Sequence, residues 1–268
     1  MTTDNHPRVR ITEDEDIDAH RPQWTIAHLS DLHLDGSARA EERAEQVILH
    51  LERRRESIDL IVLTGDITES EVTLPEGVIA KTAARLDAIA PTLTCVGNSD
   101  RPRSDPGTAA RHRTSRRVGS LLALGLDSTV PGELHGRIDA DDIAWLTEQA
   151  DAASIESVVI AMHHPPARLG HPIIDRWRAF GAVQAFEEFV ASSRVVIILA
   201  GHTHAATWTT FGGKPLLIAP GVHSAGRHRA DLTAGLTSLI DESAPPSYLL
   251  HTLRDRSSVS QHVFVGAP

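Results

Sequence analysis

The chain has 268 residues, of which 41% are hydrophobic, and a formal net charge of −10 at pH 7. That length suits one sizeable α/β domain, and the acidic balance argues against nucleic acid as a partner. Every apolar run is shorter than the roughly 18 residues of a membrane helix, and the N-terminus carries no apolar signal segment. We therefore expect a cytoplasmic protein that does not contact membranes.

The first hundred residues alternate between patterns typical of strands and of helices. Residues 1–22 are polar and acidic, and we expect a flexible leader there. Apolar side chains at helical spacing predict helices at 38–55 and 77–89. Apolar runs between them predict strands at 23–30, 58–63 and 93–96. Such alternation is typical of a mainly parallel sheet.

Residues 101–117 are expected to form a loop or a broken helix. Six arginines fall in this segment: Arg101, Arg103, Arg111, Arg113, Arg116 and Arg117. They form either a solvated basic surface or a lid whose guanidinium groups contact the phosphate of a substrate.

The remaining chain predicts more strands and two more helices. Asp139 is expected to cap the helix at 139–150, and a second helix is expected at 181–191. Strands are expected at 121–126, 155–162, 195–200, 248–253 and 259–265, with a hairpin over 208–219. We expect a core at 23–222, completed by the C-terminal strands of 223–268.

Five short polar blocks follow apolar runs in this sequence. They are Ser-Asp-Leu-His, Thr-Gly-Asp, Gly-Asn-Ser-Asp, His-His-Pro-Pro and Gly-His-Thr-His, and they contain Asp31, His33, Asp66, Asn98, His163, His202 and His204. Each block would reach the carboxyl end of a strand, which is where open α/β sheets bind ligands. The spacing of the Asp31/His33 and His202/His204 pairs would point both members of each pair into one cavity.

Hydrolysis of a phosphate ester explains why these residue types occur together. Two cations neutralise the phosphate, lower the pKa of a bound water, and align the attacking and leaving oxygens. Asp66 is suited to bridge the two ions. Asp31, His33 and His204 would complete one site, and Asn98, His163 and His202 the other. Carboxylate, imidazole and amide ligands without thiolate suit manganese, iron or zinc.

The blocks, their order and their spacing resemble the calcineurin-like metallophosphoesterase superfamily over residues 23–222. The segment from Gly125 to Ile138, followed by Asp142 to Leu146, is similar to the class III cyclic-nucleotide phosphodiesterase group within it. The resemblance implies a four-layer α-β-β-α sandwich with two mixed β-sheets. It also implies two divalent or trivalent metal ions, and members of that group are often dimers, so a homodimer is an expected partner.

One residue departs from the family pattern. The third block usually reads Gly-Asn-His, and here Ser99 replaces the histidine that contacts phosphate and protonates the leaving oxygen in relatives. We therefore expect the catalytic residues to include Asn98, Ser99, Asp100 and His164. His135 and Arg101 are expected to contact the substrate.

The implied activity is hydrolysis of a small phosphodiester by a hydroxide that bridges the metals, with a cyclic nucleotide as the favoured substrate. Alternatives within the superfamily are a phosphomonoesterase, a glycerophosphodiesterase and a DNA nuclease, although the acidic charge argues against the nuclease. A further alternative is a metal-binding sensor with low turnover, which the replacement of histidine by Ser99 would explain.

Overall fold

The computed structural model describes residues 24–69, 77–100, 111–152, 154–227, 239–254 and 256–266. The expected leader lies outside these ranges, as does Arg101 with the first part of the arginine-rich segment. Within them, no helix is both long and apolar enough to cross a membrane.

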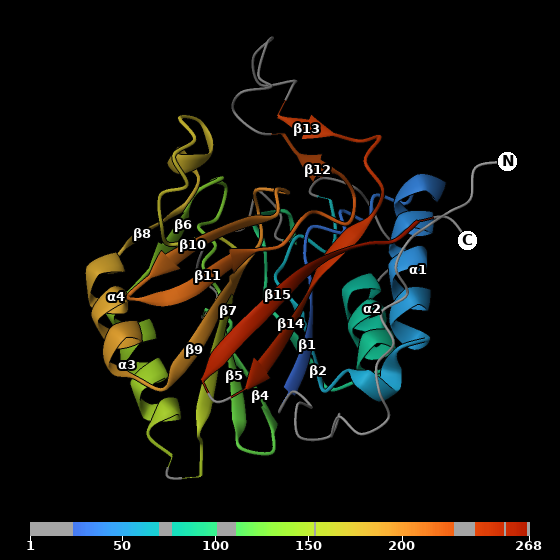
Figure 1. Ribbon diagram of the computed structural model, residues 1–268. Coiled ribbons are helices and arrows are strands. Elements are labelled where there is room, and N and C mark those ends of the chain that lie inside the picture. Colours follow the sequence, from blue (N-terminus) through green and yellow to red (C-terminus); the bar gives the residue numbers. More distant parts are fainter. Residues whose placement is uncertain are drawn as a thin grey trace, which may run out of the picture.

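Two mixed β-sheets form the centre of the fold (Figure 1). The first has the order β15-β14-β1-β2-β3, in which β1 is parallel to β2 and antiparallel to β14. Its strands are β1 Trp24–Leu29, β2 Leu60–Leu63, β3 Thr92–Thr94, β14 Ser247–Arg254 and β15 Ser257–Phe264. The last two strands of the chain thus complete the sheet that the first strand begins.

The second sheet has the order β10-β11-β9-β7-β5-β4, with parallel strands in the middle and an antiparallel strand at each edge. Its strands are β4 Thr114–Val118, β5 Leu121–Leu126, β7 Ser157–Met162, β9 Val195–Ala200, β10 Thr207–Phe211 and β11 Lys214–Ile218. The hairpin predicted over 208–219 is present as β10 and β11, with Gly212 and Gly213 at its turn.

The helices cover the outer faces of the sheets. Figure 1 shows α1 (Ala38–Glu52) and α2 (Val78–Asp87) on one flank, and α3 (Ala140–Ala150) and α4 (Val183–Ser192) on the other. One apolar cluster joins α1 and α2 to the first sheet, a second joins α3 and α4 to the second sheet, and a third contains side chains of both sheets. The central strands are buried on both faces, which explains their continuous apolar runs.

Local sequence signals account for the helix starts. The Ser37 hydroxyl accepts a hydrogen bond from the Ala40 amide at the start of α1. Asp139 and Asp142 form a reciprocal capping box at the start of α3, which confirms Asp139 as the predicted N-cap. Both caps satisfy amides that a helix leaves without partners in its first turn.

The prediction of a loop or broken helix for 101–117 is wrong in its last part. Thr114–Val118 forms β4, an edge strand antiparallel to β5. It has no apolar run, because its side chains alternate between exposed and half-buried positions. Pairing with β5 supplies backbone hydrogen bonds that local sequence patterns do not reveal.

Two short strand pairs and three short helical turns also escape the sequence patterns. The pairs are β6 (Gly136–Ile138) with β8 (Ala179–Gly181), and β12 (Ala225–Gly226) with β13 (Ile240–Asp241). The 3₁₀ turns are Arg55–Ser57, Asn98–Asp100 and Ile174–Arg176. Such elements are too short to show a period.

Candidate metal centre

The seven predicted ligands lie beyond the carboxyl ends of strands from both sheets. The first sheet contributes residues after β1, β2 and β3, and the second contributes residues after β7 and β9. In that order the side chains are Asp31 and His33, Asp66, Asn98, His163, and His202 with His204. The site therefore exists only when the two sheets pack together.

The backbone at these positions is unusual. Six non-glycine residues in the described ranges have positive φ, and five of them are predicted ligands: Asp31, His33, Asp66, His202 and His204. This left-handed conformation is rarely populated by side chains with a Cβ and tends to occur at functional sites. The paired side chains are therefore aimed into the site by left-handed turns after the strands, and not by strand alternation as the spacing predicts.

Two motif glycines allow close backbone approach around Asp66. A Cβ on Gly97 would lie 2.2 Å from the Asp66 backbone nitrogen and from its carboxylate oxygen Oδ1. Gly65 has a φ of +91°, and a Cβ there would lie 2.6 Å from the Gly97 nitrogen. Side chains at these positions would push the block that holds Asp66 away from the block that holds Asn98.

Asp31, His33 and His204 form the first cluster of possible ligand atoms. The Nε2 atoms of His33 and His204 are 3.1 Å apart. Asp31 Oδ1 lies 3.8 Å from His33 Nε2 and 3.5 Å from His204 Nε2. That oxygen is buried and has no hydrogen-bond partner within the described residues, although the other carboxylate oxygen accepts the His202 amide at 3.0 Å.

Asn98, His163 and His202 form the second cluster. His163 Nε2 lies 3.1 Å from Asn98 Oδ1 and 3.1 Å from His202 Nδ1. Asp66 lies between the clusters, since its Oδ2 is 3.6 Å from His33 Nε2 and 3.4 Å from His163 Nε2. The grouping of atoms matches the division expected from the sequence, with Asp66 shared.

Hydrogen bonds on the outer nitrogens of three of the four histidines direct the other nitrogen inward. His163 Nδ1 lies 2.7 Å from the Thr64 carbonyl oxygen, which can only accept. His33 Nδ1 lies 2.8 Å from a Glu69 carboxylate oxygen, and His204 Nδ1 lies 2.8 Å from the Ser224 hydroxyl. When a ring is neutral, its outer nitrogen carries the proton, and the inner Nε2 then presents a lone pair to its cluster.

These facing lone pairs fit bound cations. Ligand atoms about 2.1 Å from an ion and at right angles to each other are about 3.0 Å apart, close to the separations within both clusters. Two inward lone pairs at 3.1 Å repel unless a positive charge lies between them. The mixture of imidazole, carboxylate and amide donors is also suited to transition metals. Asp31, His33 and His204 form one set of side chains able to hold an ion, and His163 and His202 form another together with His164.

The electrostatics of the clusters favour ionised carboxylates. Burial alone would raise the pKa of Asp31, but the neighbouring histidines, His204 above all, hold that pKa far below its usual range. Burial also opposes ionisation of Asp66, yet His163 lowers the Asp66 pKa to about 2. Two buried carboxylates that remain charged at neutral pH create a strong preference for cations.

Ser99 interacts with the shared carboxylate. The Ser99 amide donates to Asp66 Oδ1 at 2.7 Å, and the Ser99 hydroxyl donates to Asp66 Oδ2 at 3.1 Å. Ser99 lines the pocket but its hydroxyl is already engaged, so in this arrangement it orients Asp66.

Asp100 has its oxygens occupied by backbone donors. One oxygen accepts from the amides of Ile67 and Thr68 at 2.8 and 2.9 Å, and the other accepts from the Gly97 amide at 2.9 Å. Burial, together with the nearby charge of Asp66, raises the pKa of Asp100 to about 6. Asp100 connects the Asp66 and Asn98 blocks and does not line the pocket.

His164 and His135 also lie outside the pocket lining. His164 is fully buried behind the second cluster, where its Nδ1 lies 2.9 Å from the Ser128 hydroxyl. Burial and the neighbouring His202 keep the pKa of His164 well below its usual value. His135 packs its ring edge against Phe180 and lies 3.6 Å from a Glu133 carboxylate oxygen.

The described arginines of the predicted lid are engaged elsewhere. Arg113 donates to the buried Asp142 carboxylate at 2.8 Å, and Arg111 pairs with the same carboxylate. Arg116 pairs with Asp87, and Arg117 donates to the Gly119 carbonyl. None of the four lines the pocket, so the lid hypothesis now depends on Arg101 and Arg103, which lie outside the described residues.

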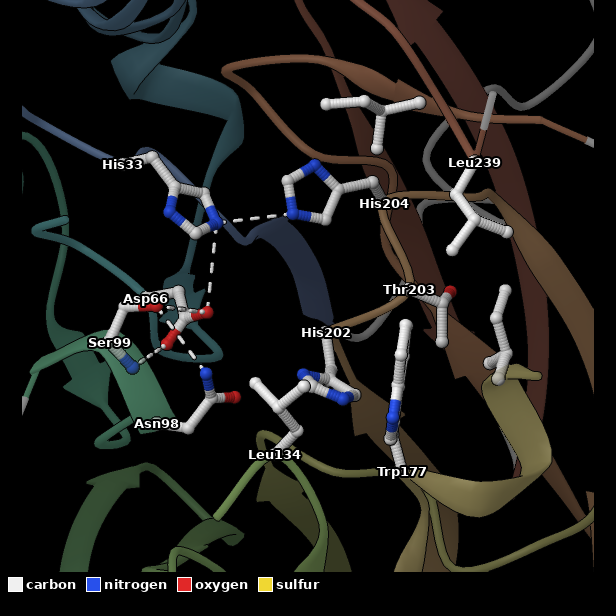
Figure 2. Close-up of a pocket in the computed structure, with 12 residues that line it drawn as sticks. His33, Asp66, Asn98, Ser99, Leu134, Trp177, His202, Thr203, His204 and Leu239 are labelled. Carbon is white, nitrogen blue, oxygen red and sulfur yellow. Dashed lines mark hydrogen bonds and ion pairs between the residues drawn. The ribbon is translucent and has the colours of Figure 1, made fainter. Parts of the chain in front are cut away.

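A pocket of about 300 Å³ opens onto both clusters (Figure 2). The polar part of its wall contains His33, Asp66, Asn98, Ser99, His202, Thr203 and His204. The remaining wall is apolar and consists of Leu134, Ile174, Trp177, Leu239 and Ile240. Figure 2 shows Trp177 and Leu239 across the pocket from Asp66 and Ser99.

The sequence patterns miss the apolar wall and the partners of the histidines. Of these partners, only Glu69 could have been found from a local pattern, because its carboxylate lies three residues after Asp66. Thr64 acts through its backbone carbonyl and Ser224 lies far along the chain, so neither leaves a motif. Trp177 belongs to a short turn between β7 and β8 and reaches the pocket only through the tertiary fold.

Comparisons with known proteins agree with this geometry. The family model of the calcineurin-like phosphoesterases matches residues 25–206. A cAMP/cGMP dual specificity phosphodiesterase of Mycobacterium tuberculosis is 29% identical over 235 residues, covering 80% of this chain and 70% of that protein. A glycerophosphodiester phosphodiesterase of Enterobacter lignolyticus is 27% identical over 253 residues, covering 84% and 86%. The structure of a purple acid phosphatase from yellow lupin seeds superposes with a TM-score of 0.58 at 13% identity, covering 90% of this chain and 51% of that one, which shows a shared fold.

Proposed function

Because this chain belongs to the calcineurin-like phosphoesterase family, we propose that it hydrolyses a small phosphodiester at the two clusters. The observation that carries the proposal is the convergence of two sets of inward-facing donor atoms on the shared carboxylate of Asp66. Asp31, His33 and His204 would hold one ion, and Asn98, His163 and His202 the other. Manganese, iron and zinc all suit this donor set.

A pair of cations bound there neutralises the phosphate, acidifies water, and aligns the attacking and leaving oxygens. The protein contributes orientation. Ser99 fixes both oxygens of Asp66 through its amide and hydroxyl. Thr64, Glu69 and Ser224 fix the histidine rings, so that the donor atoms need little rearrangement to bind metal or substrate.

The described lining residues include no free acid that could protonate the leaving oxygen. Among the described lining residues, the only imidazoles are those of His33, His202 and His204, which we assign to the ions. The Ser99 hydroxyl already donates to Asp66. The leaving oxygen would then take its proton from water, which favours substrates with good leaving groups or with strained cyclic esters.

A cyclic nucleotide is the favoured substrate. Support comes from the sequence of the Gly125 to Ile138 segment and from the Mycobacterium tuberculosis relative, which acts on cAMP and cGMP by its name. The glycerophosphodiester relative supports the second candidate, hydrolysis of a glycerol diester. Low turnover with a sensor role is the third, and it depends on the histidine that Ser99 replaces.

Turnover by manganese-loaded protein tests these candidates. The substrates would be 3′,5′- and 2′,3′-cyclic AMP, glycerophosphocholine, bis-p-nitrophenyl phosphate and p-nitrophenyl phosphate, with the metal content measured on the same sample. We expect two ions per chain and faster turnover of the diesters than of the monoester. Two bound ions without turnover of any ester would favour the sensor, and fewer than two ions would contradict the shared role of Asp66.

A further inference from the structure

The proposed chemistry uses one side of the pocket and leaves its apolar wall without a role. Leu134, Ile174, Trp177, Leu239 and Ile240 face the same cavity as the candidate ligands. Leu134 is 47% exposed and Ile240 is 40% exposed, although both are large and apolar. A ligand that covers such side chains gains free energy from removing them from water.

Trp177 is fixed in place on this wall. It ends the 3₁₀ turn Ile174–Arg176, and its amide donates to the Ile174 carbonyl at 2.9 Å. Asp175 holds this turn in place, because its carboxylate accepts a hydrogen bond from the Leu169 amide at 2.7 Å. The indole centroid lies 6.3 Å from the ring centroid of His202. The indole therefore lies on the side of the pocket next to the second cluster.

The polar groups near this wall are already engaged. Ser99 and Thr203 are the polar side chains among the described lining residues that are not candidate metal ligands. The Thr203 hydroxyl contacts the Ala205 backbone at 3.4 Å, and the Ser99 hydroxyl donates to Asp66. No lysine or arginine occurs among the described lining residues. Hydroxyl groups of a bound glycerol would lose water here, and the only side-chain donor of the described apolar wall is the indole N–H of Trp177, which is unfavourable for them. A planar aromatic group can instead bury its apolar faces against this wall, because the hydrogen-bonding groups of a base lie on its edges.

We propose that this apolar wall is a subsite for a planar aromatic group carried by the phosphate, and that Trp177 is the surface on which that group stacks. The group is a nucleobase in a nucleotide substrate. This inference rests on the proposed function and deepens it, because it makes Trp177 the residue that selects nucleotide and aryl diesters over glycerol and alkyl diesters.

Two synthetic diesters with the same leaving group test the selection. Bis-p-nitrophenyl phosphate retains an aromatic group after hydrolysis, whereas methyl p-nitrophenyl phosphate retains a methyl group. In Trp177→Ala, we expect kcat/KM for the aryl diester to fall about tenfold or more through KM, since stacking on one aromatic side chain is commonly worth that much. The methyl ester should change less than twofold, and Trp177→Phe should restore most of the aryl activity.

Trp208→Ala is the matched control, because Trp208 is 51% exposed on β10 and does not line the pocket. It should leave both esters unaffected. Equal losses for both esters in Trp177→Ala would mean that Trp177 has only a structural role. No loss for either ester would also overturn the subsite.

Binding gives a readout that is independent of turnover. Stacking of a base quenches indole fluorescence, so AMP should quench the metal-loaded wild-type protein and ribose 5-phosphate, which lacks the base, should not. The quenching should disappear in Trp177→Phe at unchanged metal content. Equal responses to AMP and ribose 5-phosphate, including no response to either, would overturn the subsite. Base-dependent quenching without turnover of any diester would instead contradict the proposed function and leave the subsite standing.

Discussion

At the scale of single residues, the candidate site depends on side chains that orient the ligands. His33 is an example, because the Glu69 carboxylate 2.8 Å from its Nδ1 directs its Nε2 toward Asp31 and His204. A carboxylate in this position also makes the imidazole a stronger ligand. Ser99 acts similarly on Asp66. These contacts explain how a site with five left-handed candidate ligands keeps one geometry.

Glu69→Ala should weaken metal binding without removing a ligand. We expect the affinity for one of the two ions to fall about tenfold, at the low end of the usual effect because the Glu69 side chain is 41% exposed. The metal affinity of Glu69→Gln should lie between that of Glu69→Ala and that of the wild type, because the amide oxygen of glutamine can still accept a hydrogen bond from His33. A competition titration against a chromophoric chelator measures this.

Glu148→Ala, at an exposed position on α3, is the matched control. An unchanged affinity in Glu69→Ala would show that the contact with His33 does not support a bound ion.

At the scale of secondary structure elements, the first sheet contains a buried polar chain. His28 on β1 lies 3.2 Å from His251 on β14, and it also contacts the Thr64 hydroxyl at 3.1 Å. His251 Nδ1 lies 2.8 Å from the Ser260 hydroxyl on β15. Both histidines are fully buried. This chain joins three neighbouring strands through side chains and works only while both rings are neutral.

Acid should destabilise the protein through this pair. Burial lowers the pKa of His251 to about 3, whereas a histidine in an unfolded chain titrates near 6.5. Between these pH values the unfolded state binds a proton that the folded state does not, so the free energy of unfolding decreases as the pH falls. In His251→Asn, the decrease between pH 7 and pH 4.5 should be smaller by about 2–3 kcal/mol.

Urea unfolding of the wild type and of His251→Asn at both pH values measures that difference. A chelator in the buffer keeps both proteins free of metal, so that the histidines of the metal clusters contribute equally to both. His112→Asn, at an exposed position, controls for the loss of one imidazole. A wild-type pH dependence in His251→Asn would contradict the assignment of acid sensitivity to this pair.

At the scale of the whole molecule, the candidate metal site connects the two sheets. Asp31, His33, Asp66 and Asn98 follow strands of the first sheet, and His163, His202 and His204 follow strands of the second. Behind them, the apolar cluster shared by the sheets holds the two halves together. Bound ions would therefore add a further connection between the two halves of the fold.

Metal removal should lower the melting temperature. Ligand binding to the folded state stabilises it by about 2.7 kcal/mol when the free ligand is at 100 times its Kd, which corresponds to a rise of about 5–10 °C for a chain of this size. Melting curves with added manganese and with chelator should differ by at least that amount. Asp66→Ala, which removes the shared carboxylate, should lose most of the difference, and a full shift in that variant would contradict the bridging assignment.

Local sequence patterns were enough to predict most strands and helices and to select the candidate donor residues. Strong apolar runs and helical spacing place most elements within a few residues, as for α1 and β9, and the polar blocks directly after the strands identify the side chains that the structure brings together. These signals are local, since each depends on residues close together in the chain. β4 is a strand that these local signals miss. It is an edge strand without an apolar run, and it forms through its pairing with β5.

The support of the candidate donors, and the side chains that face them, depend on contacts between distant parts of the chain. The left-handed backbone at Asp66 depends on contacts with the Asn98 block, and the carbonyl that orients His163 belongs to Thr64, 99 residues away. Trp177 reaches the pocket because β7 and β8 place its turn beside His202. Contacts between residues so distant in the chain leave no pattern in a single sequence, because they arise from the packing of one sheet against the other.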